Sequence, residues 1–120
     1  MEGILDQLAS CELFAGLDVG VLELLAPAAR RRRFAPGQVV FCAGETRDTV
    51  LVVVSGRLEI RAEDAQGTAS LIVLGPGEGA AEAAFFDQSP HSTTACAVDD
   101  VEVLALGAAE VRRRLENHAV

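Results

Sequence analysis

The chain has 120 residues and a formal net charge of −8, and all ten of its basic residues are arginines. Half of the residues are hydrophobic, so the sequence predicts one folded domain with a single core and not a disordered segment. An acidic chain repels nucleic-acid phosphates, so we expect no direct nucleic-acid binding. The longest interior apolar stretch is far too short to cross a bilayer, and we expect no membrane segment in this chain.

Arg30 to Arg33 form a run of four arginines, which is the exception to the acidic composition. One interpretation is a phosphate-binding patch. The simpler one, which we expect, is a solvated helix end that leads into a strand, where cations complement the helix dipole.

The three cysteines, Cys11, Cys42 and Cys96, lie in apolar or strand-like segments, so we expect buried thiols. Their odd number and the lack of a CxxC pair disfavour a disulfide framework. The N-terminus lacks the pattern of a signal peptide. These features together predict a cytoplasmic protein.

Helical patterns dominate the first thirty residues. Apolar spacing over residues 1–9 predicts a short helix, and a compact apolar turn follows at 13–17. Asp18 is a candidate N-cap for a second helix, which should end near Pro27.

From residue 34 onward, short strands and turns replace the helical pattern. We expect strands at 39–41, 50–54, 57–61, 70–74, 94–98 and 101–106, with a polar loop at 63–67. The apolar run 50–54 is typical of a strand buried on both faces. Ser55–Gly56 is a candidate hairpin turn, and Asp99–Asp100 should turn the chain so that 94–98 and 101–106 are partners. A last helix is expected from Gly107.

These elements predict a mainly β fold with flanking helices. The best match is an antiparallel eight-stranded jelly-roll barrel, or double-stranded β-helix, with N-terminal helices and a C-terminal helix. We expect a single domain over 1–120, divided into N-terminal helices (1–30), the barrel (31–106) and the C-terminal helix (107–120).

The stretch best suited to hold a ligand is 78–95. Glycines precede it, small residues favour one or two helical turns, and Pro90, His91 and a Ser/Thr cluster close it. Within it, Phe85 and Phe86 are expected to be core residues.

An ordered series of short motifs resembles the cyclic-nucleotide-binding domains of catabolite activators and protein-kinase regulatory subunits. The motifs are LFAGL (13–17), FAPGQVV (34–40), AGE (43–45), VVVSGRL (52–58) and LGPGE (74–78). The resemblance implies a phosphate-binding cassette, here at 78–94. In such a cassette, helix N–H groups and an arginine bind the cyclic phosphate, and a glutamate binds the ribose 2′-hydroxyl.

The opening of the cassette falls on residues 80–84. Glu82 takes the place of the ribose-binding glutamate, and Ala84 that of the small residue whose N–H meets the phosphate. Ala81 stands where the family has glycine, and Ala83 fills the hydrophobic position. A simpler role for Glu82 is to complement the helix dipole.

The closing of the cassette falls on residues 90–94. His91 stands where the family has its phosphate-binding arginine, Ser92 and Thr93 keep hydroxyls nearby, and Thr94 matches the residue that faces the base. Because imidazole is mostly neutral at neutral pH, the exchange should weaken binding by about one to two powers of ten. The simpler interpretation makes His91 a surface turn residue and the hydroxyl residues a strand entry.

Two functions remain open. One is a non-catalytic regulatory module that senses cAMP, cGMP or a related phosphate ligand. The other is a degenerate domain that acts as a protein-interaction or dimerisation unit, with a homodimer or an output domain as its partner. An enzyme is not expected, because His91 and His118 lie far apart and no metal-binding cupin pattern is present. No cofactor is expected besides such a nucleotide ligand.

Overall fold

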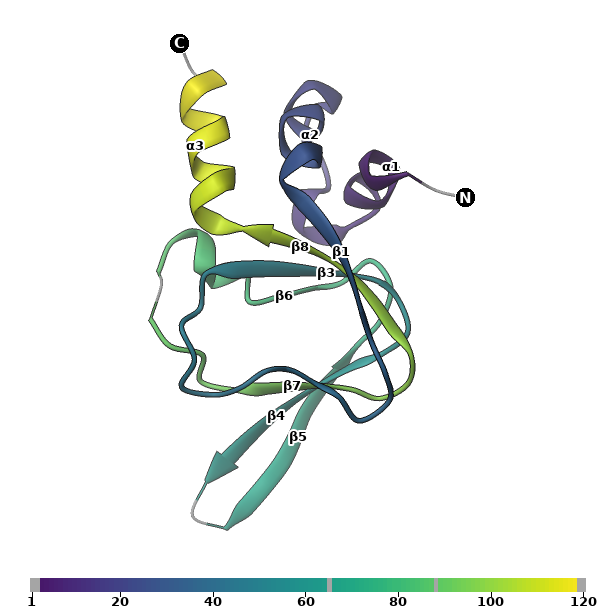
Figure 1. Ribbon diagram of the computed structural model, residues 1–120, viewed down its shortest axis with the longest axis vertical. Helices are drawn as coiled ribbons and strands as arrows, with labels where there is room; N and C mark the ends of the chain where they lie inside the picture. The colour runs from purple at the N-terminus through teal and green to yellow at the C-terminus, as the bar shows by residue number, and fades with distance from the viewer. Residues whose placement is uncertain (1–2, 65, 88, 119–120) are drawn as a thin grey trace.

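The computed structural model describes residues 3–64, 66–87 and 89–118. Figure 1 shows two stacked antiparallel sheets, with the helices above one of them. The strands are β1 (Ala29–Phe34), β2 (Val39–Phe41), β3 (Thr49–Ser55), β4 (Leu58–Asp64), β5 (Gly67–Leu74), β6 (Gly79–Ala80), β7 (Thr94–Ala97) and β8 (Val101–Gly107). The α-helices are α1 (Ile4–Ala9), α2 (Val19–Leu25) and α3 (Ala108–His118), and the 3₁₀ turns are η1 (Glu12–Phe14), η2 (Ala26–Ala28) and η3 (Glu82–Phe85).

Each sheet has four strands. The upper sheet has the order β1-β8-β3-β6 and the lower sheet the order β2-β7-β4-β5, so neighbours in a sheet are distant in the chain except in the β4–β5 hairpin. This arrangement confirms the predicted mainly β, eight-stranded fold with helices at both ends.

The two central strands of the upper sheet, β3 and β8, are buried on both faces. In β3, Val52 packs with the helices in one apolar cluster, whereas Leu51 and Val53 pack between the two sheets in another. In β8, Leu104 joins the helical cluster and Val103 joins the inter-sheet cluster. Successive strand residues point to opposite faces, which explains why these two strands are apolar almost throughout.

The lower sheet covers the core with one face only. Leu58 is fully buried between the sheets, while Leu71, Ile72 and Val73 on the edge strand β5 are exposed. The β4–β5 hairpin extends away from the body of the molecule (Figure 1). The predicted loop at 63–67 is wrong in part, because strand pairing continues to Asp64 and resumes at Gly67. The composition of that stretch is loop-like, but hairpin pairing satisfies its backbone groups.

The two predicted hairpins are also wrong. Ser55–Gly56 joins β3 of the upper sheet to β4 of the lower one, and Asp99–Asp100 joins β7 to β8 in the same manner. The two turns lie against each other, since the Arg57 backbone N–H donates to Asp99 Oδ1 at 2.7 Å. A local pattern shows where the chain turns, but the pairing partner depends on the whole fold.

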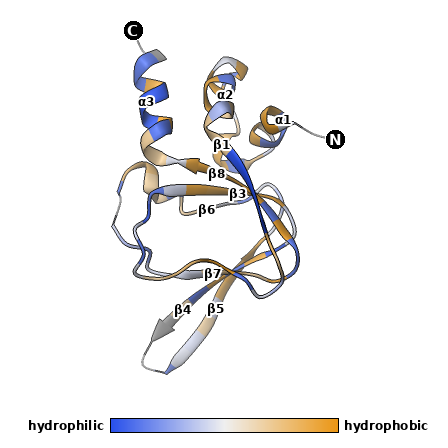
Figure 2. Cartoon of the chain, viewed as in Figure 1, coloured by the Kyte–Doolittle hydropathy of each residue, from blue (hydrophilic) through white to orange (hydrophobic). Residues whose placement is uncertain are grey.

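The arginine run lies within β1, directly after the 3₁₀ turn η2, so the predicted helix end that leads into a strand is confirmed. Arg30 Nη1 donates to the Pro27 carbonyl of η2 at 2.8 Å, whereas the other three arginines lie farther along the strand. Figure 2 shows this edge strand as the most hydrophilic part of the upper sheet. The four side chains are exposed as expected. Arg31 and Arg33 lie 3.7 and 3.6 Å from Glu102 on the neighbouring strand. Charge on an edge strand prevents unwanted strand pairing.

Two further burial predictions are wrong. Phe86 is 89% exposed, whereas Phe85 packs against the core. Cys42 is exposed, whereas the other two cysteines are buried, and all three are free thiols. Both exceptions follow apolar residues in sequence, but they lie in a turn or at a helix end where the chain leaves the core.

The N-terminal helices agree with the prediction, apart from residues 1 and 2, which lie outside the described residues. Asp18 occupies the N-cap position of α2, although its side chain makes no capping hydrogen bond. Pro27 lies in the 3₁₀ turn that follows α2. None of the helices in the described ranges is long and apolar enough to cross a membrane.

Candidate ligand-binding site

The predicted cassette forms one 3₁₀ turn, η3, directly after β6. It is therefore shorter than a helix of two turns. Ala84 in this turn is fully buried and packs with Val50 of β3 and Ala108 of α3. The cassette is thus joined by packing to the start of the C-terminal helix.

Ala81, immediately before η3, has a left-handed backbone with φ +62° and ψ +26°. Among the residues that the structure describes, no other non-glycine residue has positive φ. This conformation costs an L-residue roughly 1–2 kcal/mol, and glycine avoids most of that cost. The position that the resemblance assigned to glycine is therefore one where glycine has a physical advantage.

The closing segment is fixed by its backbone. The His91 N–H donates to the Glu45 carbonyl at 2.8 Å, and the His91 carbonyl accepts from the Gly44 N–H at 2.8 Å. The imidazole stacks on the Phe41 ring, with centroids 3.9 Å apart and an interplanar angle of 14°. This stacking leaves His91 half-buried.

A cavity of about 420 Å³ lies between the cassette and the lower sheet. Six of the eight predicted site residues line it: Ala81, Glu82, Ala83, His91, Ser92 and Thr93. Apolar side chains of the lower sheet, including Ile60 and Leu74, form part of the wall. The fold therefore brings the two ends of the cassette together around one space.

Ala84 and Thr94 do not line this cavity. The Ala84 N–H donates to the Ala81 carbonyl at 3.0 Å, which closes the 3₁₀ turn. The Thr94 hydroxyl accepts the N–H of Ala43 at 3.0 Å. In this structure both residues are used in holding the cassette and its neighbouring turn.

Negative charge surrounds much of the cavity. Glu12, Glu78 and Glu82 line it, and Glu78 Oε1 accepts the Gly75 N–H at 2.8 Å. Glu82 is exposed and has no hydrogen-bond partner among the described residues, so its carboxylate can accept a hydroxyl from a ligand.

His91 adds little positive charge. Burial lowers the pKa of its imidazole below the ordinary value, and the nearby positive charge of Arg47 lowers this pKa further. Glu45 and Asp48 act in the opposite direction but do not outweigh these effects. The ring is therefore neutral at pH 7 and offers one N–H donor.

Arg47 is a cavity residue that the sequence reasoning missed. It comes from the turn before β3, and only 17% of its side chain is exposed. Its Nε and Nη2 both donate to the Asp87 carbonyl at 3.3 Å, and Nη2 lies 3.7 Å from Asp87 Oδ2. The arginine follows the AGE motif in sequence, but only the pairing of that turn with His91 places it at the cassette.

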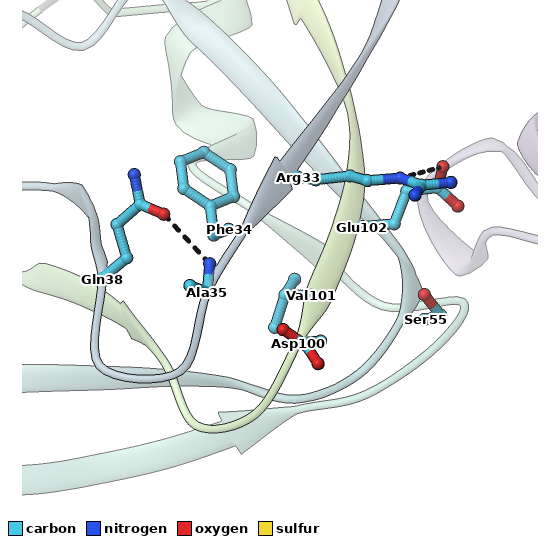
Figure 3. Close-up of a pocket in the computed structure, with 8 residues that line it drawn as sticks. All are labelled: Arg33, Phe34, Ala35, Gln38, Ser55, Asp100, Val101 and Glu102. Carbon is cyan, nitrogen blue, oxygen red and sulfur yellow. Dashed lines mark hydrogen bonds and ion pairs between the residues drawn. The ribbon is translucent and has the colours of Figure 1, made fainter.

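A larger cavity of about 650 Å³ lies elsewhere, at the open end of β1 and β8. Figure 3 shows two polar contacts at its wall, in which Gln38 Oε1 accepts the Ala35 N–H at 3.0 Å and Arg33 lies close to Glu102. None of the predicted site residues lines it. Size alone therefore does not identify the ligand site.

A two-sheet jelly roll with a cavity beside a short helical turn defines a small-molecule-binding jelly-roll domain. The family model described as "Cyclic nucleotide-binding domain" matches residues 31–118, and the chain belongs to this family. The recognition made from the ordered motifs is thereby confirmed.

Relatives agree with this assignment. The Cyclic AMP receptor protein of Thermus thermophilus is 33% identical over 95 residues, which cover 78% of this chain and 44% of the relative. Acetyltransferase Pat of Mycolicibacterium smegmatis is 31% identical over 94 residues, which cover 78% of this chain and 28% of the relative. The structure of a cyclic nucleotide-binding-like protein from Brucella abortus matches with a TM-score of 0.80 and 28% identity, covering 94% of this chain and 97% of that one. The chain spans less than half the length of the curated relatives it matches.

Proposed function

We propose that this domain is a regulatory module that binds cAMP, cGMP or a related phosphate ligand weakly in the 420 Å³ cavity. The observation that carries this proposal is the meeting of Glu82 with the segment His91–Thr93 around one cavity. The volume lies within the roughly 300–1,000 Å³ of small-molecule sites. Family membership supplies the ligand class.

Each part of the cavity has a role in this proposal. Glu82 accepts a hydrogen bond from the ribose 2′-hydroxyl, and Ser92 and Thr93 donate their hydroxyls to the phosphate. His91 adds one neutral N–H donor. Ala81 and Ala83 allow the backbone to approach the ligand closely. Ala84 and Thr94, which lie outside the lining, serve the site by fixing the cassette.

The structure gives two reasons to expect weak binding. His91 is neutral, and carboxylates line the cavity. Loss of a hydrogen bond between charged groups reduces affinity by about ten- to one-hundredfold. Carboxylates near a phosphate reduce it further.

We propose a regulatory and not a catalytic role for the domain over 1–120. Two contacts join η3 to α3: Ala84 packs against Ala108, and Arg112 Nη2 donates to the Phe85 carbonyl at 3.3 Å. A shift of η3 would therefore displace the start of α3. A ligand moves α3 only if it binds the two cassette positions with different affinity. A homodimer or an output domain that responds to the movement of α3 stays a prediction. Sedimentation of the protein with and without cAMP tests whether it forms a dimer.

The cellular setting is also part of the proposal. We place the protein in the cytoplasm, where the exposed thiol of Cys42 stays reduced. We expect no nucleic-acid binding by this domain, because the net charge is −8 and two of the β1 arginines share Glu102.

Titration calorimetry of cAMP and cGMP with the native chain and with His91→Arg tests the proposal. We expect weak binding by the native chain and binding tighter by about ten- to one-hundredfold in the variant. Phe86→Arg is the matched control, since it adds the same side chain at an exposed position that does not line the cavity. No binding by either native chain or His91→Arg favours the alternative, an interaction or dimerisation unit without a nucleotide. Tight binding by the native chain contradicts the weak site.

A further inference from the structure

The cassette lacks the arginine of its family, but the cavity does contain a guanidinium. Arg47 lines the same cavity as Ala81–Ala83 and His91–Thr93, although it comes from the turn before β3, outside the cassette. Its side chain is mostly covered, so it is held at the cavity wall and does not extend freely into solvent. Among the described residues that line the cavity, it is the one with a permanent positive charge.

Asp87 holds this guanidinium through two different groups. The backbone carbonyl of Asp87 accepts from Nε and Nη2 of Arg47, and the carboxylate oxygen Oδ2 lies 3.7 Å from Nη2. The other carboxylate oxygen, Oδ1, accepts from the backbone N–H and the hydroxyl of Ser89 at 2.9 and 2.7 Å. A guanidinium has five N–H donors, and these contacts leave the Nη1 donors of Arg47 available to a ligand.

We infer that Arg47 is the residue that binds the anionic group of the ligand, and that the Asp87 carboxylate is a built-in competitor for it. This inference rests on the proposed function for the identity of the nucleotide, but not for the binding of an anion. A phosphate in the cavity binds at the Nη1 donors of Arg47 and competes with the Asp87 carboxylate, which lies at Nη2, for the charge of the same guanidinium. The Asp87 carbonyl holds the guanidinium in place whether or not the phosphate is bound.

The acidic lining explains why such a competitor matters. Glu12, Glu78 and Glu82 face the cavity, so an anion has one strong cation to bind and several carboxylates to avoid. Because Arg47 is the main cation available to the anion, even a weak ion pair with Asp87 lowers the affinity for that anion. An ion pair with one exposed partner, as Asp87 is here, changes an equilibrium by up to about fivefold.

The test uses Arg47→Gln, Arg47→Lys and Asp87→Asn in the full chain, with cAMP and inorganic phosphate as separate probes in calorimetry and in NMR titration. We expect Arg47→Gln to weaken binding of both probes by about ten- to one-hundredfold, and Arg47→Lys to fall between it and the native chain. Asp87→Asn should strengthen binding by about two- to fivefold, because it removes the competing charge and keeps the carbonyl.

Arg57→Gln is the matched control. Arg57 also pairs with an exposed aspartate, with Nε 3.0 Å from Asp99 Oδ2, but it does not line the cavity. The Arg57→Gln substitution removes the same positive charge as Arg47→Gln, and it should change the affinity for either probe less than twofold. Thermal unfolding of every variant checks that the fold is intact.

The outcomes separate this inference from the proposed function. If the native chain binds cAMP and Arg47→Gln binds it equally well, the role of Arg47 is overturned and the proposed function stands. If phosphate binds in a manner that requires Arg47 but neither cyclic nucleotide binds, the proposed function fails and the inference stands. Binding of neither probe by the native chain overturns both.

Discussion

The strained backbone of Ala81 leads to a prediction that needs no ligand. Its φ of +62° places an L-residue in the left-handed region, at a cost of roughly 1–2 kcal/mol. Substitution by glycine removes most of this cost, but it adds about 0.5–1 kcal/mol of backbone entropy to the unfolded chain. The net expectation for Ala81→Gly is a gain of about 0.5–1 kcal/mol in the free energy of unfolding.

The measurement is urea unfolding at pH 7 together with a thermal scan, in which the gain corresponds to a rise in Tm of about 2–6 °C. Ala83→Gly is the control, since Ala83 lies within η3, has no positive φ and lines the same cavity. It should lose about 0.5–1 kcal/mol, because glycine there brings entropy cost without relief of strain. If Ala81→Gly is no more stable than Ala83→Gly, the strain argument is refuted.

Three further predictions follow from the packing and the charges. Gly56→Ala should lower the free energy of unfolding in urea by more than about 2 kcal/mol, because φ is +82° and a Cβ would lie 2.1 Å from the Asp100 carbonyl oxygen. The control Gly20→Ala, which has open space around the added Cβ, should not lower it. Affinity for cAMP should rise as pH falls below about 6.5, because the lowered pKa keeps the His91 ring neutral above that pH and its protonation at lower pH adds a cation beside the phosphate. His91→Gln should abolish the rise. Hydrogen bonds from the Arg57 backbone N–H and then from its side chain lower the pKa of Asp99. The stability that this pair adds should therefore be present above about pH 4 and be lost as pH falls below it. In Asp99→Asn, the free energy of unfolding measured in urea should depend less on pH in this acid range.

One result of the unfolding measurements at low pH would contradict the role of Asp99. If Asp99→Asn loses stability with falling pH as steeply as the native chain, the contact with Arg57 contributes nothing to folding. For the cAMP measurement, a rise that persists in His91→Gln assigns the titration to another group. The charged neighbours to consider are Arg47, Glu45 and Asp48 around the imidazole.

The sequence by itself determined the class of fold and the position of the cassette. Periodicity and turn residues predicted most strands to within a few residues, since local propensity and a two-residue repeat decide where a strand lies. The ordered glycine motifs supplied the family. The resemblance to the family placed Glu82 and His91 at the two ends of one predicted site, and in the structure both residues line one cavity.

Only the tertiary structure decided which strands pair and which charges meet. The turns at 55–56 and 99–100 cross between sheets, because the partners of β3, β7 and β8 are distant in the chain and no local pattern records them. Arg47 reaches the cassette for the same reason, through the contact of the 44–45 turn with His91. The motif therefore gives no sign of Arg47, the residue that we infer replaces the missing cassette arginine, because its place is set by a contact across forty residues of chain.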